Sequence, residues 1–322
     1  MDILRFIVRR LIFMVVLVLG VSILIFFMIN AIGNPIEILL AERPGVSPAV
    51  IESVKRYYHM DRPLTEQYMA WLGNVVRLDF GTSIVYSQPV GEMLRTWGWE
   101  TVKIQVPAIL LSLTLAIFIG VSAAVRQYTK TDFGIMTAAL LGRSVPGFFL
   151  GIILILIFSY WLGIFPSYGA YSTRGLFLKS AWLDALWHMV LPVSMLAYFE
   201  TATLTLLIRS NMVDVLRQDF IMAARASGLK PSHVVYRHAL KNAFIPALTY
   251  LAILFGLMLG AAPVTETVFT WPGLGYLYIT AIVQLDFPVI MGLNLVITLM
   301  LVMANLLTDV AYVFIDPRIR LE

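Results

Sequence analysis

The sequence contains no cysteine among its 322 residues. Disulfides, thiolate metal sites and cysteine nucleophiles are therefore excluded. Histidine is scarce as well, and its wide spacing does not favour a histidine-cluster metal site. The chain also lacks a Walker-type glycine loop, so an ATP-driven activity would require a separate ATPase chain. The four histidines are His59, His188, His233 and His238.

Charged residues are also scarce. Only 13% of the residues are charged, whereas soluble domains average about 25%. Hydrophobic residues make up 60% of the chain, and the mean hydropathy is +0.85. This composition predicts a membrane protein that crosses the bilayer several times. The net charge of +4 says little by itself, because the placement of Lys and Arg matters more in such a protein.

Six apolar runs are long enough to cross a bilayer, which takes roughly 20 residues. The first run follows three arginines but exceeds the roughly 7–15 residues of a signal-peptide core, so we expect a retained span. Pro146 and Pro192 are the expected kink points. The predicted fold is all-α, with spans at about Leu11–Ile32, Val102–Val125, Phe133–Ile164, Leu186–Ile208, Phe244–Val264 and Phe287–Phe314.

The distribution of Lys and Arg favours both termini inside the cell. With the N-terminus inside, the short inner segments 1–10, 126–132, 209–243 and 315–322 hold three, two, six and two Lys or Arg residues. The short outer segments 165–185 and 265–286 hold two and none. Because short cytoplasmic loops carry an excess of positive charge, the sequence predicts six transmembrane helices in an N-in, C-in arrangement in the cell membrane.

Three parts follow from these spans. Residues 1–32 form the N-terminal tail and first helix, 33–101 a partly helical external subdomain, and 102–322 a five-helix core. The external subdomain has two compatible interpretations: a cap that shields the outer ends of the spans, or a surface on which an external protein docks.

The most polar segment between two spans is residues 209–243, which we call the inner insert. It is basic and predicts two short helices, broken where Gly228 ends the first and Pro231 begins the second. We expect Val234, Val235 and Leu240 to form the apolar side of the second helix. That side suits either a groove in a soluble partner or the lipid surface, and the residues alone leave both open.

The inner insert resembles the coupling loop of ABC importer permeases, whose motif is Glu-Ala-Ala followed by three residues and Gly. Here Met222-Ala223-Ala224 and Gly228 occupy those positions. Further motifs resemble the dipeptide and oligopeptide permeases, and within them the first of two permease subunits. These motifs cover nearly the whole chain and include Gln218-Asp219-Phe220, Ala224-Arg225-Ala226, Arg237-His238-Ala239-Leu240, Asp79-Phe80-Gly81-Thr82-Ser83, Glu266-Thr267-Val268-Phe269-Thr270-Trp271-Pro272-Gly273-Leu274-Gly275 and Asp286-Phe287-Pro288-Val289.

The resemblance implies a protein that imports peptides by alternating access and is driven by a separate ATPase. The implied partners are a second, homologous permease subunit, two cytoplasmic ATPase subunits or domains, an external substrate-binding protein and the lipid bilayer, without nucleic acid. It implies no cofactor and no catalytic residue in this chain, because ATP and Mg²⁺ bind to the ATPase. The residues carried over as ATPase contacts are Asp219, Met222, Ala223, Ala224, Arg225, Gly228, Arg237 and His238.

The substrate stays open among peptides, oligosaccharides and nickel chelates, which relatives of this kind carry. Two alternatives from other classes are weaker. An ion-gradient-driven transporter predicts several midplane acids and an inverted repeat, and only Glu200 is placed that way. A membrane-embedded enzyme needs a cluster of polar catalytic groups, which the sequence does not suggest.

Two further groups of residues are candidates for the transport pathway. Arg143 and Glu200 lie inside expected spans, about 13–15 Å from the inner boundary at ~1.5 Å per residue, and such charges usually face a wet or paired interior. They are expected to face the pathway and could pair; alternatively Arg143 snorkels and Glu200 is hydrogen-bonded between helices.

The second group is a turn that cannot continue a helix. It indicates either a re-entrant element at an outer gate or a tight turn with its tryptophan at the membrane interface. The candidates from both groups are Arg143, Pro146, Glu200, Glu266, Trp271, Pro272 and Gly273.

Overall fold

The computed structural model describes residues 3–32, 62–172, 180–257 and 262–315. Their regular structure is helical, apart from one isolated bridge between Thr82 and Pro89. Two short stretches, η1 and η2, have the wider π-helical turn. The helices are α1 (Ile3–Ile32), α4 (Leu64–Val76), α5 (Val90–Val125), α6 (Lys130–Ser144), α7 (Gly147–Leu154), η1 (Ile155–Trp161), α8 (Ala181–Leu216), α9 (Asp219–Ala226), α10 (Pro231–His233), η2 (Val234–Ala239), α11 (Leu240–Ala243), α12 (Ile245–Leu257), α13 (Pro263–Val268), α14 (Leu274–Val283) and α15 (Phe287–Ile315).

Three of these helices, α1, α5 and α8, are long and apolar enough to cross a membrane. The number rises to five if each of two bent pairs, α6 with α7–η1 and α10–α11 with α12, counts as one span. The prediction of an all-helical, multi-span protein is therefore confirmed, with three to five candidate spans in the described part of the chain. Helix α14 and residues Phe287–Met303 of α15 are shorter apolar helices.

The predicted third span, Phe133–Ile164, is broken at Pro146, the position where the sequence predicts a kink. The chain bends by 99° between α6 and α7, so Pro146 breaks the segment rather than merely kinking it. Val145 is extended, with φ −74° and ψ 127°, because the residue before a proline avoids the helical region. Pro192, by contrast, lies inside the continuous helix α8.

Two other helices are longer than predicted. Helix α5 begins at Val90 rather than Val102, so the boundary expected at residue 101 falls inside a continuous helix. Helix α8 runs from Ala181 to Leu216, beyond both ends of the predicted span. Arg209, which was expected to open a separate polar insert, therefore belongs to α8. A helix can continue past the end of an apolar segment, because each further residue adds a backbone hydrogen bond whether its side chain is polar or apolar.

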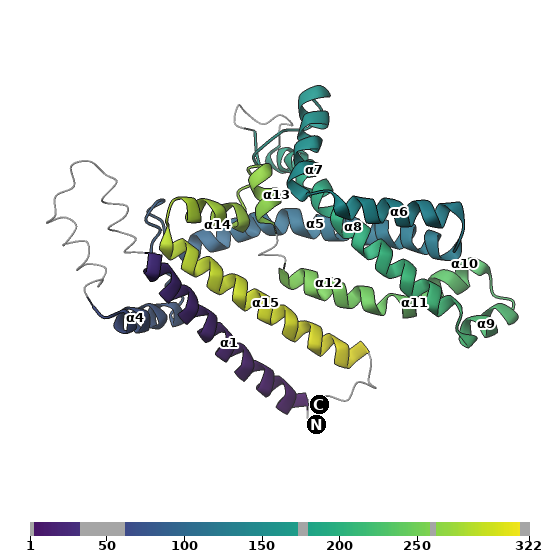
Figure 1. Cartoon of the computed structure of the whole chain (residues 1–322), viewed down its shortest axis with the longest axis horizontal. Coiled ribbons are helices and arrows are strands. Elements are labelled where there is room, and N and C mark those ends of the chain that lie inside the picture. The colour runs from purple at the N-terminus through teal and green to yellow at the C-terminus, as the bar shows by residue number, and fades with distance from the viewer. Residues whose placement is uncertain (1–2, 33–61, 173–179, 258–261, 316–322) are drawn as a thin grey trace.

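The main core lies between α5 and α8, which run side by side (Figure 1). Ala116, Leu204 and Ile208 are fully buried there. A Cβ atom on Gly120 would lie 3.1 Å from Ile208, so this glycine lets the two helices approach closely. The second half of the chain adds α12 and α15, and α1 packs against α15 on the other side.

Different helices lie on the two sides of this bundle. Figure 1 shows α14 at the left and α9–α11 at the right, with α13 above the middle of α5, beside α7. Helix α4 packs against α1 and α15 through Phe26, Tyr68 and Phe287. Helix α1 begins and α15 ends at the same end of the molecule. The predicted residues of the inner insert and those of the turn between α13 and α14 therefore lie in two separate regions.

Candidate functional site

The inner insert has the two-helix form that the sequence predicts. The first helix, α9, ends at Ala226, and Gly228 has a φ of +76°, a conformation that glycine adopts at little cost. Its N–H donates to the Arg225 carbonyl at 3.0 Å. Pro231 then occupies the first turn of α10, which continues through η2 into α11. The predicted break between Gly228 and Pro231 is confirmed.

The apolar side of the second helix faces the opposite way from the prediction. Val234 is 1% exposed, and Val235 and Leu240 pack against the same α5–α8 core. Val234 is therefore unavailable to a partner, and Val235 and Leu240 are partly covered by the chain itself. The sequence pattern identified an apolar face but not what packs against it. The chain's own helix α8 packs there. Burial in the chain's own core removes the most apolar surface at no cost in association entropy.

A different set of apolar side chains lies on the outside of the inner insert. Their exposed fractions are between 39% and 56%, which is high for large apolar groups outside a membrane span. Exposed large apolar side chains of this kind are candidates for contact with a partner. We call this set the apolar cap; it comprises Phe220, Met222, Leu229 and Tyr236.

The eight predicted contact residues lie in the same segment as the apolar cap. Six are exposed, and Ala224 and His238 are half-buried. One of them, Met222, belongs to the cap itself. The segment therefore exposes both arginines and apolar side chains, the two kinds of residue that protein interfaces favour. The six exposed residues are Asp219, Met222, Ala223, Arg225, Gly228 and Arg237.

A buried ion pair beneath the insert was not predicted. Arg209 Nε and an Nη donate to the two carboxylate oxygens of Asp132 at 3.0 and 2.7 Å. Asp132, which is 3% exposed, also accepts the Tyr128 N–H at 2.9 Å. Nearby, Arg217 donates to Gln127 at 3.1 Å. The loop between α5 and α6 is therefore bound to the end of α8 from which the insert begins.

The turn between α13 and α14, which we call the outer turn, is built around one buried acid. Glu266 is fully buried. Its Oε1 accepts the Thr101 hydroxyl at 2.8 Å, and its Oε2 accepts the Tyr276 N–H at 3.0 Å. The Thr101 oxygen in turn accepts the Leu274 N–H at 2.8 Å. The carboxylate thus caps the start of α14 and joins it to α5.

Glycines make room for this acid. A Cβ atom on Gly273 would lie 2.3 Å from the Glu266 carboxyl carbon, and one on Gly275 would lie 2.5 Å from Pro263. Pro272, which directly precedes Gly273, is half-buried. Trp271 is fully buried, and its indole N–H donates to the Glu100 carbonyl at 2.9 Å. The alternative of a tight turn matches this geometry, but the Trp271 ring is enclosed by protein and does not face lipid.

Helix α13 lies outside the helices that are long and apolar enough to span a membrane. Burial raises the pKa of its Glu266 carboxyl to about 7, against the opposing effect of the hydrogen bonds from Tyr276 and Thr101. Burial acts in this direction because it disfavours the charged carboxylate. The outer turn therefore contains a carboxyl group that can titrate near neutral pH.

A second buried acid holds the external segment. Asp286, also fully buried, accepts hydrogen bonds from the Ser83 hydroxyl and from the N–H groups of Ile84 and Val85, the last two at 3.2 and 3.3 Å. The sequence pointed to both partners through the motifs Asp79–Ser83 and Asp286–Val289, but assigned them no role. Their separation of about 200 residues hides the contact from any local pattern.

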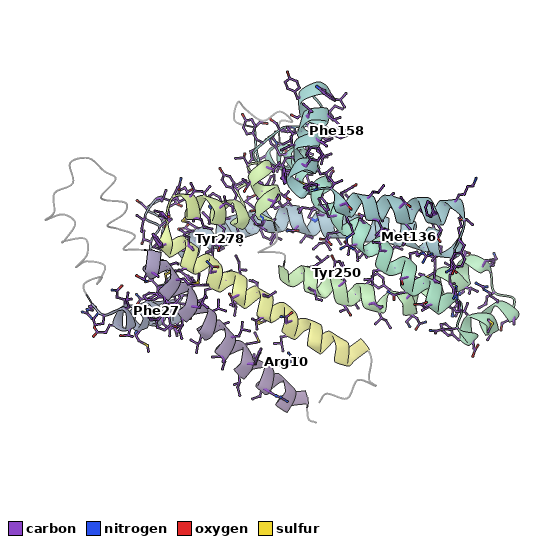
Figure 2. The ribbon with its side chains drawn as sticks, viewed as in Figure 1. Arg10, Phe27, Met136, Phe158, Tyr250 and Tyr278 are labelled. Carbon is purple, nitrogen blue, oxygen red and sulfur yellow. The ribbon has the colours of Figure 1, made fainter. Side chains whose placement is uncertain are left out.

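The two charges inside the predicted spans do not form an ion pair in the described part of the chain. Arg143 is exposed in the last turn of α6, and Pro146 is exposed at the start of α7. Glu200, half-buried on α8, instead accepts a hydrogen bond from the Tyr250 hydroxyl at 2.8 Å. Figure 2 labels Tyr250 on α12, between that helix and α8. The alternative in which Glu200 is hydrogen-bonded between helices is the one observed.

Two family models match the chain. One describes binding-protein-dependent transport system inner membrane components and matches residues 116–321. The other describes the N-terminal part of binding-protein-dependent transport system membrane components and matches residues 3–89. Together the two models match most of the chain.

Individual relatives match over almost their full length. The oligopeptide transport system permease protein AppB of Bacillus subtilis is 37% identical over 98% of both chains. The di/tripeptide transport system permease protein DppB of Pseudomonas aeruginosa is 35% identical over 98% of this chain and 99% of its own. The probable D,D-dipeptide transport system permease protein DdpB of Escherichia coli is 35% identical, over 95% and 94%.

Proposed function

The chain belongs to the family of binding-protein-dependent transport system inner membrane components, and we propose that it is one permease subunit of an ATP-driven peptide importer. It is a multi-pass protein of the inner membrane. The observation that carries the proposal is the apolar cap on the inner insert, in the same segment as the exposed Arg225 and Arg237. An exposed apolar surface outside the spans needs a protein partner.

In this proposal the partner is a cytoplasmic ATPase. The apolar cap enters a hydrophobic cleft of the ATPase, and the two arginines meet carboxylates or carbonyls at its rim, because Arg makes directional hydrogen bonds. ATP and Mg²⁺ bind in that partner, and this chain contributes no catalytic residue.

Movement of the insert reaches the spans through two contacts. The first is the packing of Ile221 and Val234, both at most 1% exposed, on the α5–α8 core. The second is the ion pair between Asp132 and Arg209. Because both contacts are buried, the insert, α8 and the α5–α6 loop move as one unit. This unit switches the side to which the pathway opens.

We place six spans in the membrane, with both termini inside. Helix α1 begins and α15 ends at the same end of the molecule, which supports an even number of membrane crossings. The strong excess of Lys and Arg in the inner insert supports its cytoplasmic position. The outer turn with Glu266, Trp271, Pro272 and Gly273 then lies at the external end and acts as the outer gate.

The complete importer contains a second permease subunit, two ATPase subunits or domains and an external binding protein. One six-span chain supplies half of the pathway. Peptides are the proposed substrate because the three relatives above are all peptide or dipeptide permeases by name. Oligosaccharides and nickel chelates are the remaining substrate candidates, and ligand identification on the binding protein decides among them.

The test is co-purification of the ATPase with variants of the apolar cap. Met222→Asp and Tyr236→Asp each place a charge at the centre of the cap. Each is expected to abolish ATPase co-purification and ATP-driven uptake while the permease still assembles in the membrane. Met69→Asp is the matched control, since Met69 on α4 is 66% exposed at a distant surface. Normal uptake by both cap variants would contradict the proposal.

A further inference from the structure

A polar cavity of about 640 Å³ is lined by η1, by the segment that follows η1 and by the first turns of α8. Its volume falls in the range of about 300–1,000 Å³ that is typical of ligand pockets. Among the described residues that line it, Pro166 alone lacks a polar side chain. The others carry neutral hydrogen-bonding groups. We call this space the outer cavity, and its polar residues are Ser159, Ser167, Tyr168, Tyr171, Ser172 and His188.

Hydrogen bonds fix the walls of the outer cavity. Asp184, which is fully buried, accepts the backbone N–H and the hydroxyl of Ser172, each at 2.7 Å. Gly169 has a φ of +79°, and its N–H donates to the Phe269 carbonyl at 2.9 Å. Ser159 lies on η1, and π-helical turns of this kind are frequent at functional sites. The cavity is therefore held by α8 on one side and bonded to the start of the outer turn on the other.

His188 gives the cavity a hydrogen-bond acceptor. The residue is 6% exposed, and its Nδ1 lies 2.8 Å from the Asp184 carbonyl oxygen and 3.9 Å from the Asp184 carboxylate. Since both of these oxygens accept, Nδ1 carries the hydrogen, and Nε2 of the neutral ring carries a lone pair. In the described part of the chain Nε2 has no hydrogen-bond partner. The ring therefore offers a buried, unused acceptor to a ligand.

Tyr171 gives the cavity a donor. Its hydroxyl oxygen accepts a hydrogen bond from Lys103 Nζ at 3.2 Å, and the same ammonium group forms an ion pair with Glu100 at 2.6 Å. The hydroxyl hydrogen of Tyr171 therefore points away from Lys103 and is available to a ligand. The hydroxyls of Ser159 and Ser167 also line the cavity, and neither has a hydrogen-bond partner among the described residues.

We propose that the outer cavity binds the backbone of an imported peptide before the peptide passes the outer turn. A peptide group has one carbonyl acceptor and one N–H donor, which complement the Tyr171 hydroxyl and the His188 Nε2 respectively. Recognition by neutral groups does not depend on the charges of the peptide, so it suits peptides of varied sequence. The inference rests on the proposed function, because it requires peptide substrates and an external outer turn.

Two sets of contacts connect the outer cavity to the outer turn. One is the hydrogen bond from Gly169 to Phe269. The other passes through Glu100, which pairs with the ammonium group bonded to Tyr171 and whose carbonyl accepts the Trp271 indole N–H at 2.9 Å. A peptide in the cavity is therefore bound next to the groups that hold the proposed gate.

The test is peptide binding to the purified importer, without its binding protein, in phosphatidylcholine nanodiscs. Binding is measured by saturation-transfer NMR. The first probe is N-acetyl-tetraalanine amide, which has no terminal charge, and the second is its analogue with esters in place of the internal amides, which lacks those N–H donors. On the wild type, the ester analogue is expected to bind about fivefold more weakly, the loss of one neutral hydrogen bond. The third probe, maltotetraose, is not expected to bind.

The variants assign each hydrogen bond to one residue. His188→Phe should weaken the amide probe about fivefold and remove its advantage over the ester, and His188→Gln, which has an acceptor oxygen, should restore part of that advantage. Tyr171→Phe should weaken both probes, because both keep their carbonyls. Tyr160→Phe is the matched control, since Tyr160 is 79% exposed on η1 outside the described lining. His233→Phe, on the exposed surface of α10, is the control for the histidine variant.

Several results would overturn the inference. They are wild-type binding of both probes by Tyr171→Phe, no binding of the amide probe by the wild type, or equally strong binding of maltotetraose. A loss of affinity for the ligand-free binding protein in Tyr171→Phe, without any peptide binding, would also overturn it and would identify a docking surface instead. Because Tyr171 is exposed, this variant decides the question even if His188→Phe fails to fold.

ATP-driven peptide uptake with the binding protein is measured on the same complex. If uptake occurs but the variants of the outer cavity bind the probes as the wild type does, only the inference fails. If the assembled importer takes up no peptide, the proposed function fails with it.

Discussion

The guanidinium of Arg209 and the carboxylate of Asp132 form a two-pronged ion pair between the inner end of α8 and the start of α6. Asp132 is almost completely buried, and Thr129 caps the same helix. The two parallel hydrogen bonds fix the relative orientation of the two side chains, in addition to the attraction between their charges. It ties the loop between α5 and α6 to the helix that leads into the inner insert, and so joins two inner segments that the sequence separates by 77 residues.

Breaking this pair should destabilise the protein and weaken coupling. Asp132→Asn leaves the partly buried guanidinium of Arg209 without its anion, which should cost more than about 1 kcal/mol, the upper range for an exposed pair, and less than the about 3–5 kcal/mol of a fully buried one. We expect a lower temperature of thermal unfolding and fewer peptides imported per ATP hydrolysed. Arg217→Gln is the control, because it removes one exposed hydrogen bond to Gln127 and should change stability by less than about 1 kcal/mol. Equal effects of the two variants would contradict a special role for the pair.

The outer turn should not tolerate a side chain at Gly273. A Cβ atom there would lie 2.3 Å from the Glu266 carboxyl carbon, so Gly273→Ala must displace a fully buried group. We expect destabilisation of about 1–3 kcal/mol or more and loss of transport. Gly73→Ala is the matched control, since nothing lies within 4 Å of its added Cβ in the middle of α4. It should be neutral or slightly stabilising.

Glu266 should make stability depend on pH between about 4.5 and 7. Its pKa is raised from 4.5 to about 7 by burial, so the folded state binds more protons than the unfolded state in this range. The contribution of this group to the free energy of unfolding is therefore greatest below pH 4.5 and falls as pH rises to about 7, by on the order of 3 kcal/mol.

The measurement is the unfolding temperature of the wild type and of Glu266→Gln in detergent, at pH 5 and pH 8. At pH 5, where the wild-type carboxyl is protonated, the variant is expected to be less stable, because its amide nitrogen cannot accept a hydrogen bond at one of the two positions that the carboxyl oxygens occupy. The informative quantity is the difference between the two pH values, which should be smaller in the variant. An unchanged difference would show that Glu266 does not titrate in this range.

Asp286 should hold the external segment in place. Asp286→Asn replaces one acceptor oxygen by a donor and leaves some of the bonds from Ser83, Ile84 and Val85 unmade, at a cost of about 1–3 kcal/mol. Limited proteolysis should then cleave the segment between α4 and α5 faster. Glu92→Gln provides a control on the adjacent helix, because Glu92 is exposed and its side chain makes no hydrogen bond or ion pair in the described part of the chain. Cleavage at the wild-type rate in Asp286→Asn would contradict this anchoring.

Local patterns were sufficient for several elements. The composition alone predicts a helical membrane protein, and the Gly228–Pro231 break follows from the backbone preferences of those two residues. Pro146 was correctly identified as a point of bending. The size of the bend was underestimated, because the orientation of α7 depends on what it packs against. The order of motifs along the chain also identified the family correctly.

The tertiary contacts decided the rest. Val234 looks like part of a partner-binding face, yet it is buried on α8, and Phe220 and Tyr236 take the exposed positions instead. Arg209 looks like a free basic residue but is paired with Asp132. Glu266 looks like a gate residue, and the structure shows it as the buried cap of α14; a role in gating remains a prediction.

By itself, the sequence determined that the chain is helical, that the backbone turns between Gly228 and Pro231, and that the apolar runs require a membrane. These properties depend on a few neighbouring residues. Only the tertiary structure decided which charged and apolar side chains are available to partners. That availability depends on groups such as Thr101 and Asp132, which lie 165 and 77 residues from Glu266 and Arg209. No periodicity extends across such separations, because it is packing that brings these groups together.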